Sequence, residues 1–188
     1  MNEKSRLSPV VKEVLEWTYC IIIAVILAIA VRYYIGTPTV VKQPSMYPTL
    51  KQDQRLILNK LTRTFKKTPN RGDIITFEAP SVSFVPVAEA NLNNPVATYN
   101  YNLKNWFQKF CYYVLEIKKT SYIKRVIALP GEHVKIENDK VYINGKELEE
   151  TYLQPGVLTN DLNGAFTDII VPEGTIFVMG DNRRTKYR

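Results

Sequence analysis

The sequence predicts a mainly β protein, with an antiparallel sheet or barrel-like domain behind one N-terminal transmembrane helix. Three observations lead to this prediction: an apolar run over residues 17–35, short apolar segments separated by turn signals from residue 37 onward, and a helical spacing over residues 103–117. The predicted organisation is a cytoplasmic tail (1–16), a transmembrane anchor (17–36) and an extracytoplasmic domain (37–188) that contains an insert with a helix (81–119).

The composition favours a folded domain with an excess of positive charge. The chain has 188 residues, of which 45% are hydrophobic and 23% are charged, so it can bury a core. The formal net charge is +7, but the basic residues are scattered and form no nucleic-acid-binding motif. An anionic membrane surface is therefore the expected partner of this charge, and nucleic acid is not. With one histidine and no Cys-x-x-Cys pair, no metal or other cofactor is expected.

The N-terminal apolar run is long enough to cross a membrane as a helix. It covers 19 residues from Trp17 to Ile35, close to the roughly 20 that a bilayer requires. The basic residues Lys4, Arg6 and Lys12 precede the run, and basic residues before a first span favour a cytoplasmic N-terminus. We therefore expect a single-pass protein of the cell membrane, with its main domain on the outer side.

A cleaved signal peptide is the alternative interpretation of the same run. Ala28-Ile29-Ala30 has the small-x-small pattern of a cleavage site. The apolar run continues past this pattern, however, which favours an anchor that is retained.

Short strands separated by turn residues are predicted after the anchor. They cover residues 40–41, 55–58, 74–77, 122–129, 134–136, 141–143, 146–148 and 176–179. Pro130-Gly131 and Asn144-Gly145 are strong turn signals between them. Residues 137–140 are predicted to join two of the strands as a hairpin.

The insert over residues 81–119 interrupts this pattern. Its first half is typical of a loop, whereas its second half has apolar residues on one helical face: Leu103, Trp106, Phe107, Phe110, Val114 and Ile117. Lysines surround that face. An interfacial helix that lies on lipid fits this pattern, and a helix packed on the β domain fits it equally.

Two residues suggest a nucleophile and its base. Ser45 lies between Pro44 and Pro48, which restrict its backbone and would hold its hydroxyl and its N–H in a fixed geometry. Lys124 is the only charge on its face of an apolar strand, and burial of a lysine lowers its pKa so that it can act as a base. The alternatives are a serine that only makes a turn, and a lysine that points from an edge strand into water. His133, the single histidine, follows a turn and is the other candidate base.

Four stretches together resemble the successive boxes of bacterial type I signal peptidases, most closely the small single-anchor enzymes of Gram-positive type. The stretches are Ser45-Met46-Tyr47-Pro48-Thr49-Leu50, Arg71-Gly72-Asp73-Ile74, Tyr122-Ile123-Lys124-Arg125 with Leu129-Pro130-Gly131-Glu132, and Gly180-Asp181-Asn182-Arg183. Their order and the preceding apolar run match the family as well.

The resemblance implies a membrane-anchored serine endopeptidase that removes signal peptides from secreted preproteins after a small-x-small motif. It implies Ser45 as nucleophile and Lys124 as general base. It also implies substrate or oxyanion contacts from Gln43, Met46 and Tyr122. Structural roles near the site are implied for Arg71, Asp73, Arg125, Gly180, Asp181, Asn182 and Arg183. The implied partners are signal peptides, the lipid bilayer and the secretion machinery, with no cofactor.

The last box departs from the family pattern. In the family, Gly-Asp-Asn-Arg is followed after two residues by Ser-x-Asp-Ser-Arg, and the first of these serines bonds the lysine. Here Lys186 stands at that position, and Thr185 would replace the serine only if the turn shifted. A C-terminus that is truncated relative to the family is therefore expected.

Two alternatives to an active signal peptidase stay open, and the departure of the last box favours the first of them. One is a catalytically impaired or inactive relative that binds signal peptides or secretion components. The other is a self-cleaving Ser/Lys protease of the repressor type. The apolar anchor and the lack of a DNA-binding segment argue against the second alternative.

Overall fold

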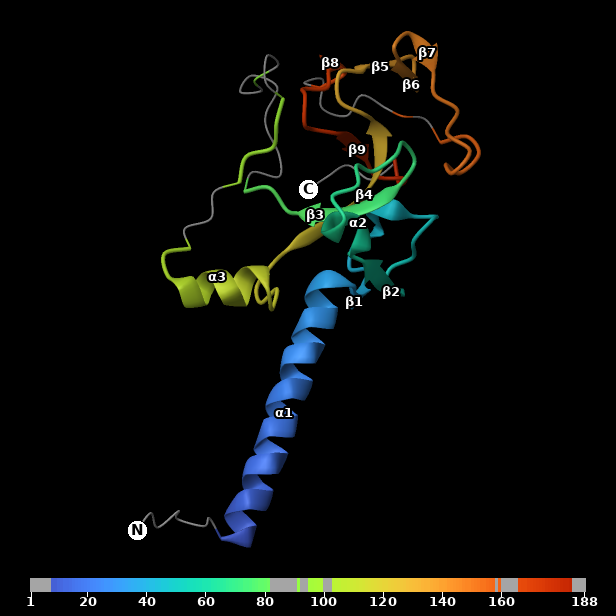
Figure 1. The fold of residues 1–188 in the computed structure, drawn as a ribbon. Helices are drawn as coiled ribbons and strands as arrows, with labels where there is room; N and C mark the ends of the chain where they lie inside the picture. Colours follow the sequence, from blue (N-terminus) through green and yellow to red (C-terminus); the bar gives the residue numbers. More distant parts are fainter. Residues whose placement is uncertain are drawn as a thin grey trace.

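The computed structural model describes residues 8–81, 91, 95–99, 103–157, 159 and 166–183. A long N-terminal helix projects from a domain built of antiparallel strands (Figure 1). The predicted fold class, mainly antiparallel β behind one N-terminal helix, is confirmed.

Helix α1 (Pro9–Tyr34) extends the predicted anchor toward the N-terminus. It begins at a Ser-Pro start signal: the Ser8 side chain accepts a hydrogen bond from the backbone N–H of Val11 (3.4 Å), and proline fits the first helical turn. Its 26 residues correspond to a length of about 39 Å. With a mean hydropathy of 2.5 over its most apolar window and no buried residue, α1 is long and apolar enough to cross a membrane.

The chain enters a two-stranded sheet directly after α1. Strand β1 (Gly36–Val40) pairs antiparallel with β2 (Arg55–Asn59), so the first strand starts before the predicted position and ends within it. A Cβ atom at Gly36 would lie 2.8 Å from the backbone oxygen of Leu58. The close approach of the two strands beside the end of α1 therefore requires glycine.

Two short helical segments accompany these strands. The 3-10 turn η1 (Pro44–Met46) lies between β1 and β2, and α2 (Leu61–Thr64) follows β2. Neither segment is among the sequence predictions. Both are a single turn long, too short to show a hydrophobic period.

Strand β4 (Ser121–Ala128) is the centre of a three-stranded sheet, between β3 (Ile74–Glu78) and β9 (Phe177–Met179). Both pairings are antiparallel, and Lys124 lies opposite Ile75 of β3. Strand β4 is therefore not an edge strand as a whole, contrary to the alternative interpretation, although its register with β9 starts at Arg125, the residue after Lys124.

A four-stranded sheet lies at the far end of the domain from α1 (Figure 1). Its antiparallel order is β7 (Lys146–Glu147), β6 (Lys140–Ile143), β5 (His133–Glu137) and β8 (Asp168–Ile170). The predicted hairpin between β5 and β6 is confirmed. Strand β8 is not among the predictions, since its three residues become a strand only by pairing with β5.

The main hydrophobic core joins the C-terminal end of β4 to the four-stranded sheet. Its buried members are Ile127, Ala128, Val134, Val141, Ile143, Ile169 and Val171. Partly buried aromatic residues, including Phe166 and Phe177, pack against this cluster. The end of β4 that follows Lys124 is therefore fixed in a close-packed interior.

The predicted insert contains helix α3 (Trp106–Tyr113), which is shorter than the helical spacing of residues 103–117 suggests. It ends at Tyr113, with Val114 as its C-cap, and the positive φ angles of Glu116 (56°) and Lys118 (62°) prevent a regular helix from continuing to Ile117. Most of the predicted loop in the first half of the insert lies outside the described residues.

Candidate active site

Ser45 lies in the middle of η1 and is buried, with 8% of its surface exposed. Pro44 begins the turn, and the backbone N–H of Tyr47 donates to the Pro44 oxygen (3.0 Å). The next residue, Met46, is almost fully buried and anchors the turn in the domain. Because η1 contacts β4, the turn that carries Ser45 lies against the strand that carries Lys124.

Lys124 lies on the central strand in a partly buried position. Burial lowers the pKa of its ammonium group from 10.5 to about 8, and the carboxylate of Asp181 partly opposes this effect. A substantial fraction of the side chain is then the neutral amine near pH 8. A neutral amine can accept a proton, whereas an ordinary lysine is fully protonated at this pH.

The Gly-Asp-Asn-Arg segment after β9 holds η1 from the other side. The backbone N–H of Asn182 donates to the backbone carbonyl oxygen of Ser45 (3.0 Å), and the Asn182 side-chain amide donates to the backbone carbonyl oxygen of Pro44 (3.1 Å). Residues far apart in the sequence thus fix the backbone of the candidate nucleophile.

Asp181 pairs with Arg125, the neighbour of Lys124 on β4. Arg125 Nε donates to Oδ1 (2.9 Å), and a terminal guanidinium nitrogen donates to Oδ2 (2.7 Å). The hydroxyl of Thr49, four residues after Ser45, also donates to Oδ2 (2.6 Å). Asp181 and Arg125 are both buried, and the hydrogen bond to Asp181 is the largest cause of a raised Arg125 pKa. One carboxylate therefore connects β4, the segment after η1 and the end of β9.

Arg183 extends this polar network toward the segment after β7. Its Nε donates to the Gly180 oxygen (2.7 Å), a terminal nitrogen donates to the Thr159 hydroxyl (2.8 Å), and it is ion-paired with Glu150. Glu150 also accepts a hydrogen bond from the hydroxyl of Tyr152 (2.6 Å), and the Tyr152 ring lies 4.0 Å from the Arg125 guanidinium carbon. Among the described residues, no buried side-chain nitrogen or oxygen lacks a hydrogen-bond partner.

The Arg-Gly-Asp segment supports β4 along its other edge. The backbone N–H of Gly72 donates to the Val126 oxygen (2.8 Å), and the Val126 N–H donates to the Asp73 oxygen (2.9 Å). The Asp73 carboxylate closes the turn by accepting from the N–H of Asn70 (2.8 Å). Arg71 is ion-paired with Glu132 and thereby links this turn to the segment after β4.

Gln43 and Tyr122 remain predictions as contact residues. Gln43 precedes η1, is exposed and makes no side-chain hydrogen bond to the turn. Tyr122 is half-buried, with its ring edge against Phe77 at a centroid distance of 6.2 Å. His133, the other candidate base, lies in the four-stranded sheet, where its Nε2 is 2.6 Å from an Asp168 oxygen. That sheet is separate from the one that contacts η1.

Several residues around the site are not among the sequence predictions. Thr49 lies within a quoted box but is given no role there. Glu150, Tyr152 and Thr159 are distant from every box, and no local pattern predicts their contacts with arginines from β4 and from the C-terminal segment.

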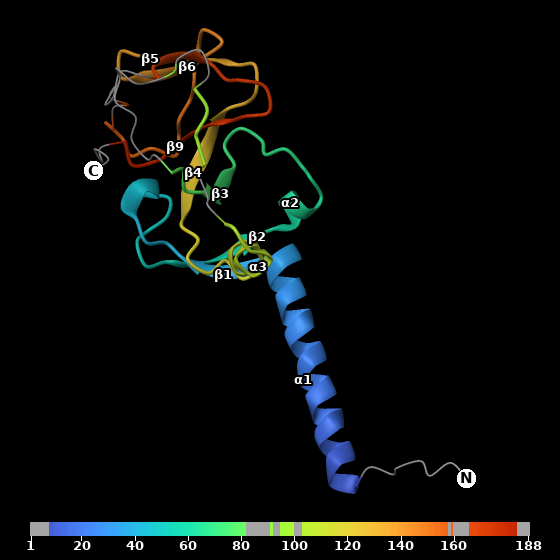
Figure 2. The same cartoon turned by 90° about the vertical axis from the view of Figure 1, so that its left-hand side faces the viewer.

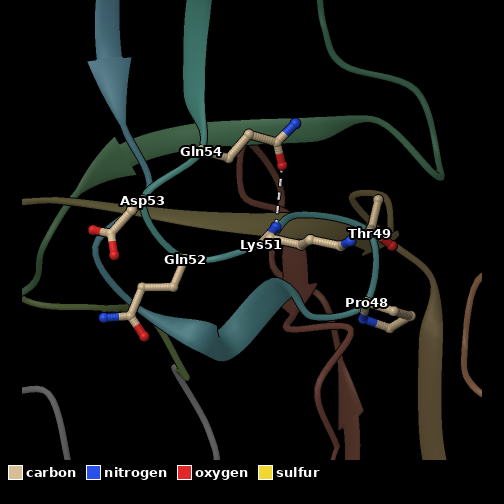
Figure 3. A pocket seen from close by; sticks show the side chains of 6 residues that line it. All are labelled: Pro48, Thr49, Lys51, Gln52, Asp53 and Gln54. Carbon is tan, nitrogen blue, oxygen red and sulfur yellow. Dashed lines mark hydrogen bonds between the residues drawn. The ribbon is translucent and has the colours of Figure 1, made fainter.

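An open pocket of about 510 Å³ lies beside η1, along the loop that leads to β2 (Figure 3). Its lining residues are Pro48, Thr49, Lys51, Gln52, Asp53 and Gln54. The loop is folded back on itself, because the Lys51 N–H donates to the side-chain oxygen of Gln54 (3.1 Å). In the part of the chain that the structure describes, no group of three or more His, Cys, Asp or Glu side chains could hold a metal ion.

The segment that departs from the family pattern, residues 184–188, lies outside the described residues. The expectations for Thr185 and Lys186 concern this segment and stay predictions.

The sequence matches the family described as signal peptidase, peptidase S26, over residues 14–186. It is 34% identical over 183 residues to signal peptidase I S of Bacillus subtilis, with 92% of this chain and 76% of that protein covered. It is 36% identical over 181 residues to signal peptidase I P of Bacillus subtilis subsp. natto, with 91% and 75% covered. A crystal structure of a signal peptidase I from Enterococcus faecalis is 27% identical, covers 64% of this chain and 83% of that chain, and has a TM-score of 0.37.

Proposed function

The chain belongs to the signal peptidase family, peptidase S26, and we propose that it is a membrane-anchored serine endopeptidase that removes signal peptides from secreted preproteins. One observation supports this proposal beyond the family: η1 holds Ser45 against β4, whose Lys124 has a pKa lowered to about 8. A buried serine beside the strand of a partly deprotonated lysine supplies a nucleophile and a base.

The proposed reaction is acyl transfer through a Ser/Lys dyad. The neutral amine of Lys124 accepts the proton of the Ser45 hydroxyl while the Ser45 oxygen attacks the scissile carbonyl carbon. The resulting ammonium then donates this proton to the leaving amine as the peptide bond breaks. Lys124, neutral again, accepts a proton from water while the water oxygen attacks the acyl carbon. It then passes this proton to the Ser45 hydroxyl oxygen as the ester bond to Ser45 breaks, which releases the signal peptide with a free carboxylate.

The oxyanion that forms during this reaction needs hydrogen-bond donors. We propose the backbone N–H of Ser45 as one donor and the side-chain amide of Gln43 as the second. The hydrogen bond from the Asn182 N–H to the backbone carbonyl oxygen of Ser45 supports this assignment, because it fixes the peptide backbone of η1. Removal of the Gln43 side-chain amide would eliminate the second donor and leave the backbone N–H of Ser45 in place.

The proposed substrate binds in an extended conformation, as an added strand beside the active-site strands, and is cleaved after a small-x-small motif. Met46 and Tyr122 are proposed to contact it. Met46 is buried beside Ser45, so it would form the apolar floor under the small side chains rather than a projecting wall.

The proposed topology follows from α1 and from the charges before it. Residues 1–16 form the cytoplasmic tail, 17–36 the anchor and 37–188 the extracytoplasmic peptidase domain, with 81–119 as its insert. Ser45 lies ten residues after Ile35, so the chain keeps it within about 35 Å of the anchor's end. The apolar core of a signal peptide ends near the same surface. The secretion machinery that delivers preproteins is the further proposed partner.

The test of the dyad uses the detergent-solubilised full chain with a preprotein, and compares it with Ser45→Ala and Lys124→Ala. Each substitution should abolish measurable cleavage, because it removes the nucleophile or the base. His133→Ala is the matched control and should cleave normally, since His133 lies in the four-stranded sheet. Circular dichroism verifies that each variant is folded. Cleavage that persists in the Ser45 or Lys124 variant would contradict the dyad.

A non-catalytic member of the family is the second candidate function, which the sequence of residues 184–188 favours. It would bind signal peptides or secretion components without cutting them. The cleavage assay, together with binding of a labelled signal peptide, separates the two candidates. A non-catalytic member would bind the labelled peptide but leave the preprotein intact, whereas a peptidase would cut the preprotein.

A further inference from the structure

We propose that Tyr152 and Glu150 are positioning residues of the proposed peptidase, which hold two buried arginines and thereby fix the turn over residues 180–183 beside the dyad. This inference rests on the proposed Ser/Lys dyad and adds to it two residues that lie in none of the four boxes. Both act through an arginine, Arg125 or Arg183, rather than on the substrate.

The segment after β7 that carries both residues is anchored in the hydrophobic core. The backbone N–H of Leu148 donates to the backbone oxygen of Val141 on β6 (2.8 Å), and the side chains of Leu148 and Tyr152 pack against the core cluster. The backbone N–H of Leu153 donates to the backbone oxygen of Glu150 (3.1 Å) and closes a turn around both residues. A close-packed anchor of this kind gives the side chains that it carries a fixed direction.

The Tyr152 ring covers one face of the Arg125 guanidinium, whose carbon lies 4.0 Å from the ring centroid. The edges of this guanidinium are engaged elsewhere: two of its nitrogens donate to Asp181, and the third donates to the backbone oxygen of Gly72 (2.8 Å). The ring therefore adds no conventional hydrogen bond. Its contribution is to orient the planar group and to exclude water from its face, which keeps Arg125 in the two-pronged geometry that pairs with a carboxylate.

Glu150 connects this ring to the second arginine. Its carboxylate accepts a hydrogen bond from the Tyr152 hydroxyl (2.6 Å) and is ion-paired with Arg183, whose side chain is 4% exposed. Burial is the largest cause that raises the pKa of Tyr152, so the phenol keeps the proton that it donates to Glu150. Arg183 in turn donates to the backbone oxygen of Gly180 (2.7 Å). One carboxylate therefore contacts both the residue that covers Arg125 and the residue that ends the turn.

The turn over residues 180–183 connects this unit to the dyad. It follows β9, which lies beside β4 in Figures 1 and 2. It carries Asn182, which holds η1 through two hydrogen bonds, and Asp181, whose carboxylate raises the pKa of Lys124 against the effect of burial. The bidentate pair with Arg125 offsets the charge of Asp181. If Arg125 turned away, more of this charge would act on Lys124 and its pKa would rise.

The charged and titratable groups around Lys124 come from few elements. Among the described residues they are Tyr122 and Arg125 on β4, Asp181 and Arg183 in the turn, and Glu150 and Tyr152 after β7. The packed elements η1 and β9 contain no charged residue. Strand β3 places Ile75 opposite Lys124, and its one charged residue, Glu78, lies opposite Ser121 at the other end of the pairing. Asp181 is therefore the charge through which the unit reaches Lys124.

The test measures the pKa of Lys124 by NMR and needs no cleavage. The full chain in detergent micelles carries lysine that is isotope-labelled at Cε, and the Lys124 signal is the one that disappears in Lys124→Arg. In the unmodified chain this signal should titrate at about pH 8. Tyr152→Met replaces the ring with an apolar side chain that has no aromatic face. Tyr152→Phe keeps the ring and removes the hydroxyl.

Tyr152→Met should raise the measured pKa of Lys124 by about one pH unit, because a nearby opposite charge typically shifts a pKa by about 1 to 3 units. The rise of kcat/KM with pH should move upward by the same amount. Tyr152→Phe should keep both close to those of the unmodified chain, since its ring still covers Arg125. Tyr142→Met is the matched control: Tyr142 lies on β6, in the sheet far from α1 (Figures 1 and 2), and its replacement should change neither value.

Glu150→Asp tests the other half of the unit and is milder, because it keeps the charge that pairs with Arg183 and only draws it back. It should raise the Lys124 pKa by a smaller amount. The proposal is overturned if folded Tyr152→Met leaves this pKa unchanged, or if Tyr152→Phe raises it as much. If circular dichroism shows that Tyr152→Met is unfolded, Glu150→Asp decides: a raised pKa supports the proposal and an unchanged one overturns it. An unmodified chain that cuts no preprotein would contradict the proposed function, whereas the titration of Lys124 would still test the positioning residues.

Discussion

Lys124 is the residue on which the proposed chemistry depends. A lysine on an antiparallel strand has an ordinary pKa unless its surroundings disfavour the charge, and here burial is the dominant cause of the shift. Asp181 acts in the opposite direction, but its carboxylate is engaged by Arg125 and Thr49. The Asp181 carboxylate therefore lies near Lys124 without raising the Lys124 pKa back to its ordinary value.

The rate of cleavage should rise as the pH passes through about 8. Below this value Lys124 gains a proton and no longer accepts one from Ser45, so kcat/KM should fall about tenfold for each further pH unit. Above it the neutral amine dominates and the rate should level off. The measurement is kcat/KM for a signal-peptide substrate across this range, in buffers of constant ionic strength. A profile that stays flat on both sides of pH 8 would show that Lys124 is not the base.

At the scale of elements, the buried pair of Arg125 and Asp181 joins β4 to the end of β9. Thr49 adds the loop after η1 to the same carboxylate, and Asn182 adds η1 itself. The pair therefore holds together three pieces of chain that must meet at the site. Its contribution to stability appears when one partner is removed, because the other charge is then buried without compensation.

Asp181→Asn should lower the free energy of unfolding by about 3 to 5 kcal/mol, since it leaves the buried Arg125 guanidinium without a carboxylate. Thermal or urea unfolding followed by circular dichroism measures this change. Glu147→Gln is the matched control, because it removes the carboxylate of the exposed pair with Lys140, and its unfolding should match that of the unmodified chain. Equal stability of the two variants would contradict the structural role of Asp181.

The sequence predicted those elements whose own pattern determines them. An apolar run with Pro130-Gly131 at its end predicts β4, and the asparagine-glycine turn predicts the end of β6. Elements that exist only through a neighbour were missed. Helix α2 is one turn stabilised by its bonds to α1, and β8 is three residues paired with β5.

The candidate site was predictable only in part, because several of its contacts depend on segments that are far apart in the sequence. Periodicity places Arg125 on the opposite face of its strand from Lys124 and requires that it find an acid or solvent. It cannot identify Asp181 as that acid, because the contact depends on how β9 and η1 pack. The residue patterns make Ser45 and Lys124 a candidate nucleophile and base, but they leave a turn serine and an exposed lysine open as alternatives; the resemblance of the boxes favours the dyad over these alternatives.

On the scale of the whole molecule, helix α1, the proposed anchor, joins the domain through a very short connection. Helix α1 ends at Tyr34 and β1 begins at Gly36, so a single residue separates them. The ion pair of Glu116 with Lys60 adds a second connection: it joins the insert to Lys60, whose backbone N–H donates to the Ile35 oxygen at the end of α1. The orientation of the domain relative to α1 is therefore set by specific contacts as well as by the short connection.

Glu116→Gln should destabilise the full chain in detergent micelles, because it leaves the buried ammonium of Lys60 unpaired, at a cost of about 3 kcal/mol or more. The double variant Glu116→Gln with Lys60→Met should recover most of this loss, since it removes the stranded charge as well. Thermal unfolding of the four chains in a double-mutant cycle gives the coupling energy. Additive effects of the two substitutions would show that the pair does not connect the anchor to the insert.

The direct junction at Gly36 has a consequence for how a cleavage position would be selected. A domain on a flexible tether samples many heights above a membrane. If α1 spans the bilayer as proposed, a domain that follows it after a single residue keeps a more constant height. For the proposed peptidase, the distance of Ser45 from the bilayer surface would then be fixed. This distance would determine how far from the membrane a substrate chain is cut. The length of the substrate's apolar segment would set the bond that reaches Ser45, in addition to the side chains that flank it.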